Sequence, residues 1–462
     1  MNRVFFGSFS VSKGDIRLMD YTSGKDILQV TTYEVLLDSA KMNLPARLHG
    51  AIHNIRDMGD FAFIIIRIPA GLVQCFWDKS TGDQSVFDVL TSECTVDLLG
   101  SAHEEPRAPG GVEVRVGSIT LLTSPSEDFP INISKRKLGI NLDTDLNNRP
   151  ITLRSGELRA RFRIQAGVVR GFREFLDANG FTDIRTPKIV GGNAEGGTNV
   201  FRLDYFGKKG FLAQSDQFYK QTMVGVYERV YEVGPVFRAE KHSTVRHLNE
   251  YITLDFEMGY IKSFRDIMAM ETACLSYIFE LLRRDFSREC KALGMEIPVI
   301  TEIPTVKFRD AKELISAEYG HKIKDPYDLE PIEEQLIGRY FKEKYGSDLV
   351  FVTHYPVKKR PFYAMDDPED PKFTLSFDLL FRGMEITTGG QRIHGYQEQI
   401  DKMITKGLDP EGFADYLMIH KYGMPPHGGL GLGLERLCMK LFDDNNVRYS
   451  SLFPRDMNRL QP

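Results

Sequence analysis

Residues 231–260, YEVGPVFRAEKHSTVRHLNEYITLDFEMGY, concentrate ionisable side chains between two apolar runs that favour β-strands. In a strand, side chains two residues apart share a face, so Tyr251 and Asp255 point one way and the aliphatic residues between them point the other. Two antiparallel strands joined by a polar turn would bring the charged residues of both to one cleft. The side chains expected there are Arg238, Glu240, His242, Arg246, Tyr251 and Asp255.

Charged residues on strands more often form a solvent-exposed sheet face with salt bridges, and such a face would explain the presence of the arginines. It accounts less well for the flat aromatic ring of Tyr251 beside Arg238. An aromatic ring can stack on a base, and a guanidinium binds phosphate oxygens through charge-assisted hydrogen bonds. The combination therefore indicates a site for an adenine nucleotide.

A second candidate is the glycine-rich stretch 427–437, HGGLGLGLERL, which contains Arg436. A glycine-rich loop that leads into a helix can bring backbone N–H groups and a guanidinium to a phosphate. The stretch is neither a P-loop nor a GxGxxG motif after a strand, so by itself it predicts only a turn.

The elements that must position these residues fall into two regions. Residues 1–30 resemble an extension, and residues 31–135 contain short β-rich runs at the spacing of a small barrel or sandwich, the class that includes the five-stranded OB-fold. Residues 136–155 have the Asn- and Asp-rich composition of a hinge or linker. Residues 156–462 form a second domain, rich in strands and interrupted by a helical insertion at about 264–345.

Within the second domain, helical spacing predicts a long helix over SGELRARFRIQAGVVRGFREFLDANGF, with a serine before its first turn. A strand is expected at TDIRTPKIV, residues 182–190. Further on, FTLSFDLLFRGMEITTGG predicts strands and GYQEQIDKMITKG a helix.

Bulk composition limits the class of protein. A chain of 462 residues with 42% hydrophobic and 27% charged residues is typical of a soluble protein with two or more domains, and it has no apolar run of membrane-spanning length. Five widely spaced cysteines without a CxxC pair indicate a reducing compartment, so we expect a cytoplasmic protein. The net charge of -5 excludes a generally basic nucleic-acid coat but leaves room for a local basic surface.

Taken together, the motifs resemble those of the class II aminoacyl-tRNA synthetases. GPVFRAE with RHLNE resembles motif two, GLGLERL resembles motif three, and TPKI, with Pro187, stands where motif one is expected. AEGGTNVF, AQSDQFYKQ, ITTGGQRIHGY and LFPRDMNRLQP are similar to the aspartyl-tRNA synthetases of the archaeal type. The resemblance extends from about residue 45 to the end and implies an α+β fold: an N-terminal OB-fold barrel, then an antiparallel catalytic sheet with flanking helices.

The resemblance implies an ATP site. Arg238 is expected on the α-phosphate and Arg436 on the γ-phosphate, as the two catalytic residues, with Tyr251 stacked on adenine. Glu240 and His242 belong to the same site, although the family often has a second acidic residue where this chain has Lys241. The ligands implied for Mg²⁺, which prefers oxygen donors, are Glu385, Asp378 and Thr388. Strand parity places 378 and 385 on opposite faces, so both reach one ion only if a bulge lies near Gly383.

The resemblance also implies an aspartate site. Residues at positions that hold the α-ammonium group are Glu195, Gln217 and Thr388. Lys220 and Arg392 match the cations on the side-chain carboxylate, with Asp255 fixing them. A carboxylate moved from water into a cleft needs opposite charge, which these two cations supply. One departure is the SDQ sequence, in which Asp216 replaces the usual proline of the family.

The implied partners are L-aspartate, the aspartate tRNA and a second copy of the chain, since motif one lies at a two-fold interface in this family. The barrel would bind the anticodon, with Phe61 or Phe63 available for base stacking. Whether the asparagine tRNA is charged as well stays open. His53 and Pro109 stand where relaxed archaeal members often have tryptophan and lysine, which favours strict charging.

Three alternative functions share parts of this pattern. The closely similar asparaginyl enzymes tend to carry an acidic residue at the position of Lys220, and the barrel argues against an asparagine-forming paralogue. A non-catalytic RNA-binding paralogue would have lost the phosphate arginines or the metal carboxylate, whereas Arg238, Arg436 and Glu385 are all present.

Overall fold

The structure is a computed structural model that describes residues 31, 33–69, 71–135, 137–192, 199–241 and 244–462. The chain divides into two compact units, residues 1–135 and 136–462. Two residues of the expected site, Glu195 and His242, lie outside the described ranges.

The first unit is a closed five-stranded barrel in the order β1-β2-β3-β5-β4, which confirms the predicted OB-type fold. Its strands are β1 Pro45–Asp57, β2 Phe61–Ile68, β3 Gly71–Asp78, β4 Thr95–Glu104 and β5 Val112–Thr123. Its helices are α1 Tyr33–Lys41, α2 Gln84–Phe87 and the short 3-10 helix η1 Pro109–Gly111. Ile64, Ile66, Val73 and Cys75 alternate along β2 and β3 and fill the barrel interior, because period-two spacing puts them on one face.

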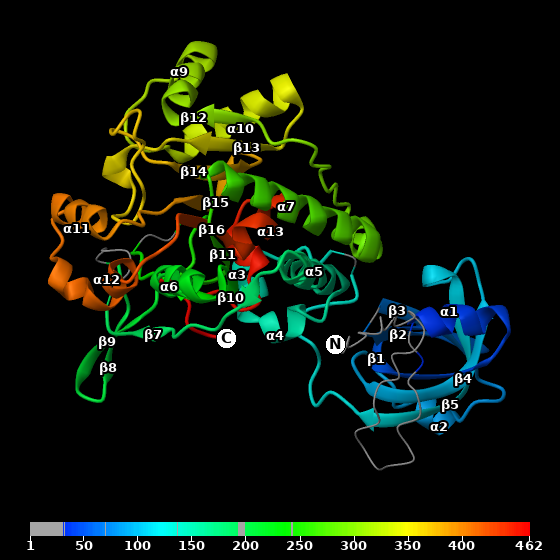
Figure 1. Ribbon diagram of the computed structural model, residues 1–462. Helices are drawn as coiled ribbons and strands as arrows, with labels where there is room; N and C mark the ends of the chain where they lie inside the picture. Colours follow the sequence, from blue (N-terminus) through cyan, green and yellow to red (C-terminus); the bar gives the residue numbers. More distant parts are fainter. Residues whose placement is uncertain (1–30, 32, 70, 136, 193–198, 242–243) are drawn as a thin grey trace, which may run out of the picture. The chain divides into compact units, whose positions relative to one another are not determined.

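The second unit is built on an eight-stranded sheet in the order β12-β13-β14-β15-β16-β11-β10-β6 (Figure 1). Its strands are β6 Thr182–Asp183, β10 Arg229–Phe237, β11 Glu250–Gly259, β12 Thr305–Lys307, β13 Leu349–Thr353, β14 Ser376–Phe381, β15 Met384–Gln391 and β16 His427–Gly433. The central pairs are antiparallel, as predicted, and only the outermost pairs β6·β10 and β12·β13 are parallel. A separate three-stranded sheet contains β7 Ile189–Val190, β9 Lys208–Leu212 and β8 Arg202–Tyr205.

Helices flank the large sheet. They are α3 Leu142–Asn147, α4 Arg149–Thr152, α5 Gly156–Ala178, α6 Gln217–Tyr227, α7 Arg265–Asp285, α8 Ser287–Leu293, α9 Phe308–Tyr319, α10 Pro331–Tyr345, α11 Tyr396–Thr405, α12 Ala414–Lys421 and α13 Leu434–Leu441. Short 3-10 helices are η2 Val357–Lys359, η3 Pro410–Phe413 and η4 Val447–Ser450. The long helix predicted after residue 154 is α5, and Ser155 caps it by accepting a hydrogen bond from the Leu158 N–H at 3.3 Å.

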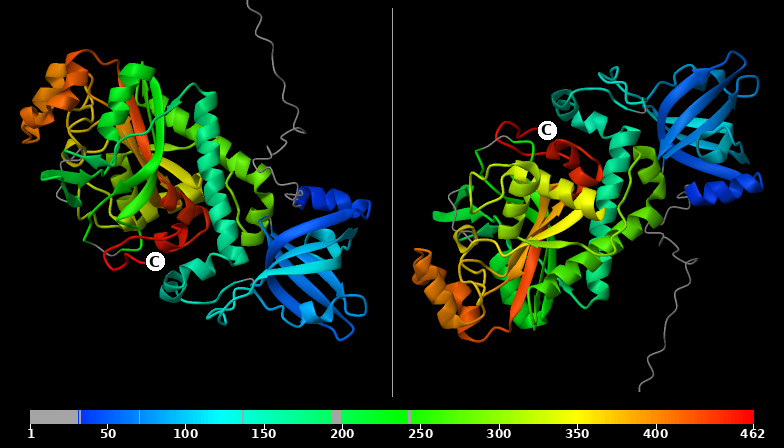
Figure 2. Two further views of the ribbon diagram at one scale, coloured as in Figure 1. Left: turned by 90° about the horizontal axis from the view of Figure 1, so that it is seen from below. Right: turned by 90° about the horizontal axis from the view of Figure 1, so that it is seen from above.

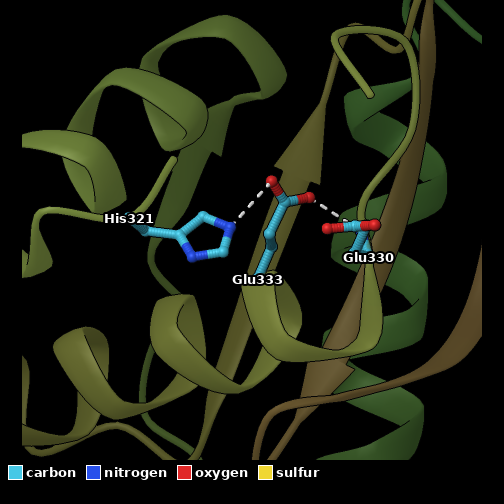
Figure 3. Close-up of side chains that lie close together, drawn as sticks. All are labelled: His321, Glu330 and Glu333. Atoms are coloured by element: carbon cyan, nitrogen blue, oxygen red, sulfur yellow. Dashed lines mark hydrogen bonds and ion pairs between the residues drawn. The ribbon is translucent and has the colours of Figure 1, made fainter. Parts of the chain in front are cut away.

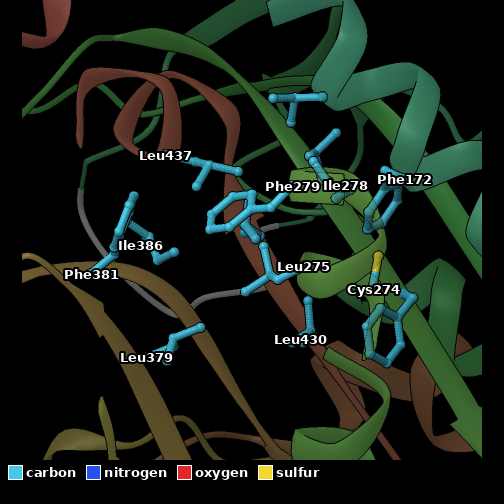
Figure 4. Packing of buried hydrophobic residues seen from close by; sticks show 14 of the residues in the cluster. Phe172, Cys274, Leu275, Ile278, Phe279, Leu379, Phe381, Ile386, Leu430 and Leu437 are labelled. Carbon is cyan, nitrogen blue, oxygen red and sulfur yellow. The ribbon is translucent and has the colours of Figure 1, made fainter. Parts of the chain in front are cut away.

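One face of the sheet packs on α5 and α7, which run alongside one another (Figure 2). On α7, Cys274, Leu275 and Ile278 recur at helical spacing and are buried against the sheet (Figure 4). On β11, Leu254 and Phe256 point into the same core. The alternate residues of β11 therefore face the other side of the sheet, where the cleft lies.

Two expectations need correction. Residues 182–190 do not form one strand: β6 joins the large sheet, β7 joins the small sheet, and 184–188 link them. Pro187 in this link lacks the N–H that a continuous ladder needs. The segment 136–155, expected as a linker, contains α3 and α4, and the buried Arg149 donates to Asp145 Oδ2 at 2.6 Å and to the carbonyl of Ser451 at 2.7 Å.

Candidate active site

A cleft of about 500 Å³ lies over the sheet face opposite α7. Its lining includes eleven of the residues singled out from the sequence: Gln217, Lys220, Arg238, Glu240, Arg246, Tyr251, Asp255, Glu385, Thr388, Arg392 and Arg436. They come from α6, β11, β15 and α13 and from the segments that follow β10 and β15. Positions 216 residues apart, from 220 to 436, thus meet in one cavity.

Tyr251 and three arginines line one end of the cleft. The guanidinium carbon of Arg238 lies 5.9 Å from the centre of the Tyr251 ring. Arg436 donates to Glu385 Oε1 at 3.2 Å, and Arg246 forms an ion pair with Glu334. A flat ring and three guanidiniums around one opening form a site for an aromatic base that carries phosphates.

Glu334 is a carboxylate that sequence reasoning missed. It lies on α10, accepts a hydrogen bond from the backbone N–H of Glu385 at 2.9 Å and is buried. Burial and the nearby Glu385 charge raise the pKa of Glu334 to about 7, while Arg246 opposes the shift. No local pattern separates this glutamate from the other carboxylates on α10.

The bulge needed to bring the two metal-ligand candidates together is present, but it lies at Ile386. Thr387 faces Leu379 and Glu385 faces Leu380, so Ile386 is the extra residue of β15. Asp378 pairs with Thr388 across the strands, and the Thr388 hydroxyl lies 3.4 Å from Glu385 Oε1. The extra residue reverses the parity, which puts 385 and 388 on the same face as 378.

This donor set fits a hard cation. Two carboxylates and a hydroxyl offer oxygen ligands beside the cationic end of the cleft. Burial and the Glu385 charge raise the pKa of Asp378 to about 6, although Arg360 opposes the shift. Arg360 lies 2.8 Å from Asp378 Oδ1, so this arginine, which sequence reasoning also missed, competes with an ion for that oxygen.

At the other end of the cleft, two cations are held by two different carboxylates. Lys220 donates to Asp255 Oδ1 at 2.5 Å and to the carbonyl of Leu430 at 2.9 Å. Arg392 donates to Glu257 Oε1 at 2.9 Å and to the carbonyl of Gly429 at 3.0 Å. The expectation that Asp255 fixes both cations was therefore wrong, because the partner of Arg392 is Glu257, which shares the cleft face of β11.

The four charged side chains of these two pairs are buried. Burial opposes the charged form of Lys220, but the nearby carboxylates, Asp255 first, outweigh this effect and raise its pKa. Burial likewise opposes the charged form of Arg392, but the Glu257 carboxylate outweighs the effect of burial and raises the pKa of the guanidinium. Both cations therefore stay charged in the cleft and can meet an anionic ligand there.

The glycine-rich stretch is a strand rather than the expected loop. In β16, Gly429 lies opposite Glu257 and Gly431 opposite Asp255. A Cβ at Gly429 would come within 2.2 Å of Glu257 Oε2, and one at Gly431 within 2.9 Å of Asp255 Oδ1. These glycines leave room for the two carboxylates that hold the cations, and Arg436 follows on α13.

The remaining residues singled out from the sequence are placed as follows. Gln217 is buried at the start of α6, and its amide nitrogen has no hydrogen-bond partner among the described residues. In the barrel, His53 is buried on β1 and Pro109 is exposed in η1. Phe61, Phe63 and Phe76 form a cluster of half-buried rings with centroids 5.4–6.1 Å apart.

A histidine and two glutamates lie close together elsewhere in the second unit: His321, Glu330 and Glu333 (Figure 3). Lys312 donates to Glu333 Oε2 at 2.5 Å and to the carbonyls of Asp325 and Asp328. The lysine ammonium thus already supplies a positive charge at Glu333 Oε2. Glu330 and Glu333 also form the capping box of α10, so the cluster is structural.

Comparison with known proteins decides the family. The model for class II tRNA synthetases (D, K and N) matches residues 141–457. The chain belongs to this family. An aspartate-tRNA(Asp/Asn) ligase from Thermus thermophilus is 45% identical over 92% of this chain and 98% of its own length. One from Deinococcus radiodurans is 44% identical over 90% of this chain and 95% of its own length.

Among solved structures, this class II synthetase is similar to asparaginyl-tRNA synthetase from Pyrococcus horikoshii complexed with asparaginyl-adenylate. The TM-score is 0.86 at 28% identity, over 94% of this chain and all of that chain. That complex shows that the shared fold accommodates an aminoacyl-adenylate. The described helices of this synthetase include none with the length and apolar character needed to cross a membrane.

Proposed function

We propose that the protein activates L-aspartate with ATP and transfers it to the 3′ end of tRNA. One observation carries this proposal: two buried cations, Lys220 and Arg392, stand in the same cleft as the arginines and ring of a nucleotide site. In the first step a carboxylate oxygen of aspartate attacks the α-phosphorus and pyrophosphate leaves. In the second step the terminal hydroxyl of the tRNA attacks the acyl carbon and AMP leaves.

In this proposal Arg238 binds the α-phosphate, Arg436 the γ-phosphate, and Tyr251 stacks on adenine, while Glu240 and His242 complete the site. Their proximity in the cleft, His242 apart, supports these roles. Guanidiniums fixed where charge develops on the phosphates would stabilise the transition state without reorganising. Mg²⁺, held by Glu385 with Asp378 and Thr388, would supply further positive charge on the phosphates.

For aspartate, we infer that Gln217, Thr388 and Glu195 hold the α-ammonium group and that Lys220 and Arg392 bind the side-chain carboxylate. Asp255 and Glu257 orient the two cations, as their hydrogen bonds indicate. Asparagine has nearly the same size, so charge rather than shape would separate the two substrates. This argument favours aspartate over the asparaginyl alternative despite the structural likeness to an asparaginyl enzyme.

We expect the protein to charge both the aspartate tRNA and the asparagine tRNA. The relatives at 44% and 45% identity have names that include both tRNAs, and the burial of His53 weakens the argument for strict charging. The half-buried rings of Phe61, Phe63 and Phe76 support base stacking at the barrel. Aminoacylation of each purified tRNA with labelled aspartate measures the preference, and a rate for the asparagine tRNA at background level would contradict dual charging.

We further propose a C₂ homodimer in which motif one lies at the interface. The small sheet beside that motif exposes apolar side chains: Ile189 is 50% exposed and Phe206 91%. Ile189 lies on β7 and Phe206 in the β8–β9 turn, and exposed apolar side chains of this kind can take part in an interaction surface. Sedimentation or light scattering should give twice the chain mass of 52.7 kDa, and a stable, fully active monomer would refute the dimer.

The five buried free thiols support action in the reducing cytoplasm. The activity itself is tested by aspartate-dependent exchange of pyrophosphate into ATP, with asparagine as the control substrate. Exchange that depends on asparagine rather than aspartate would overturn the proposed function.

A further inference from the structure

Asp216 is a buried carboxylate to which the proposed reaction assigns no role. It stands at the N-cap of α6, where the family usually has proline, and it is 1% exposed. Its side chain makes no cap hydrogen bond, and neither carboxylate oxygen has a hydrogen-bond partner among the described residues. An ionised carboxylate that is buried without hydrogen bonds destabilises the folded protein, so burial here favours the protonated form.

Two cations of the described structure lie near Asp216, and each is closer to another carboxylate. Lys220, one helical turn later, has its ammonium 3.8 Å from Asp216 Oδ1 but 2.5 Å from Asp255 Oδ1. Lys188 also faces Asp216, yet it lies 3.0 Å from Glu232. The groups around Asp216 are thus Lys220 on α6, Asp255 on β11, Glu232 on β10 and Lys188 after β6.

The charges beneath the aspartate pocket balance without Asp216. Lys220 and Arg392 carry two positive charges, and Asp255 and Glu257 carry two negative ones. A substrate carboxylate adds a third negative charge. An ionised Asp216 would add a fourth, close to the ammonium that the substrate must share, and like charges in a low-dielectric site repel strongly.

We propose that Asp216 is a positioning residue that must be protonated for aspartate to bind well. Ionisation of Asp216 then weakens the ion pair between Lys220 and the substrate carboxylate. Burial first, and the Asp255 charge second, raise the pKa of Asp216 well above its ordinary value. A bound substrate anion stabilises the protonated form further. This inference rests on the proposed function and adds a pH-dependent contribution to substrate affinity.

The sign of the effect follows from linkage. Below the pKa of Asp216 in the free enzyme, the proton is already present and the KM for aspartate is flat. Above it, binding must take up one proton, so the KM rises by up to about tenfold for each pH unit. The KM for ATP, which binds at the other end of the cleft, and kcat should not follow this slope.

Pyrophosphate exchange measured from roughly pH 6 to pH 9 tests the proposal with two variants, Asp216→Asn and Asp216→Pro. Asparagine is the neutral isostere, and proline is the usual residue of the family, which guards against one variant failing to fold. In both variants the KM for aspartate should no longer rise with pH. Loss of the α-ammonium proton from aspartate itself at high pH affects the wild type and both variants alike. Calorimetry of aspartate binding in buffers of different ionisation enthalpy should show proton uptake only in the wild type.

A flat KM in the wild type, or the same slope in the wild type and in both variants, overturns the role of Asp216 and leaves the proposed function standing. The absence of aspartate-dependent exchange in the wild type at every pH would instead overturn the proposed function.

Discussion

Arg436→Ala and Arg238→Ala each lower aspartate-dependent pyrophosphate exchange by at least about thirtyfold, equivalent to ~2 kcal/mol of lost transition-state stabilisation. Both guanidiniums line the cleft, and the side chain of Arg436 is 24% exposed beside Glu385. A charge-assisted hydrogen bond in such a partly desolvated site is stronger than one in water, because less solvent screens it.

The matched control is Arg284→Ala, which removes an arginine from α7 whose side chain is 57% exposed and paired with Asp285. Exposed ion pairs contribute little, so this variant should keep the exchange rate of the wild type. If Arg238→Ala or Arg436→Ala retained most of its activity, that arginine would not bind the triphosphate.

Lys220→Met raises the KM for aspartate strongly, by the equivalent of about 2–5 kcal/mol, and shrinks the preference for aspartate over asparagine. The substrate carboxylate loses one of its two cations, while a neutral amide loses little. The KM for ATP should stay within a few-fold, because the nucleotide lies at the other end of the cleft. Exchange kinetics with each amino acid measure both effects.

Lys220→Met also leaves the buried Asp255 without its cation, so the fold itself loses stability. Lys312→Met controls for this, because Lys312 is similarly buried and pairs with Glu333, and neither of the two lines the cleft. It should lower the melting temperature and leave the KM for aspartate unchanged. An unchanged preference in Lys220→Met would remove that lysine from substrate selection.

Much of the fold was predictable because its signals are local. Alternation along β11 separates Leu254 and Phe256 from Tyr251 and Asp255, and a strand obeys that alternation wherever it sits. Helix α5 was predictable from its spacing and the cap at Ser155. The prediction of one strand over residues 182–190 was wrong because the two ends of this segment join different sheets, which no local pattern specifies.

The sequence by itself determined most of the side chains that could form the site: Arg238, Arg436, Tyr251, Glu385 and Lys220 are recognisable by type and motif, whereas Glu257, Glu334 and Arg360 are not. The tertiary structure decided which of them pair. Glu257 rather than Asp255 holds Arg392, and the bulge at Ile386 brings Glu385 to the face of Asp378. The glycines of β16 leave space for the side chains of Asp255 and Glu257, which lie opposite them in the sheet but more than 170 positions earlier in the chain. Such pairings depend on strand register and burial, which arise from long-range contacts and leave no signal in a local stretch of sequence.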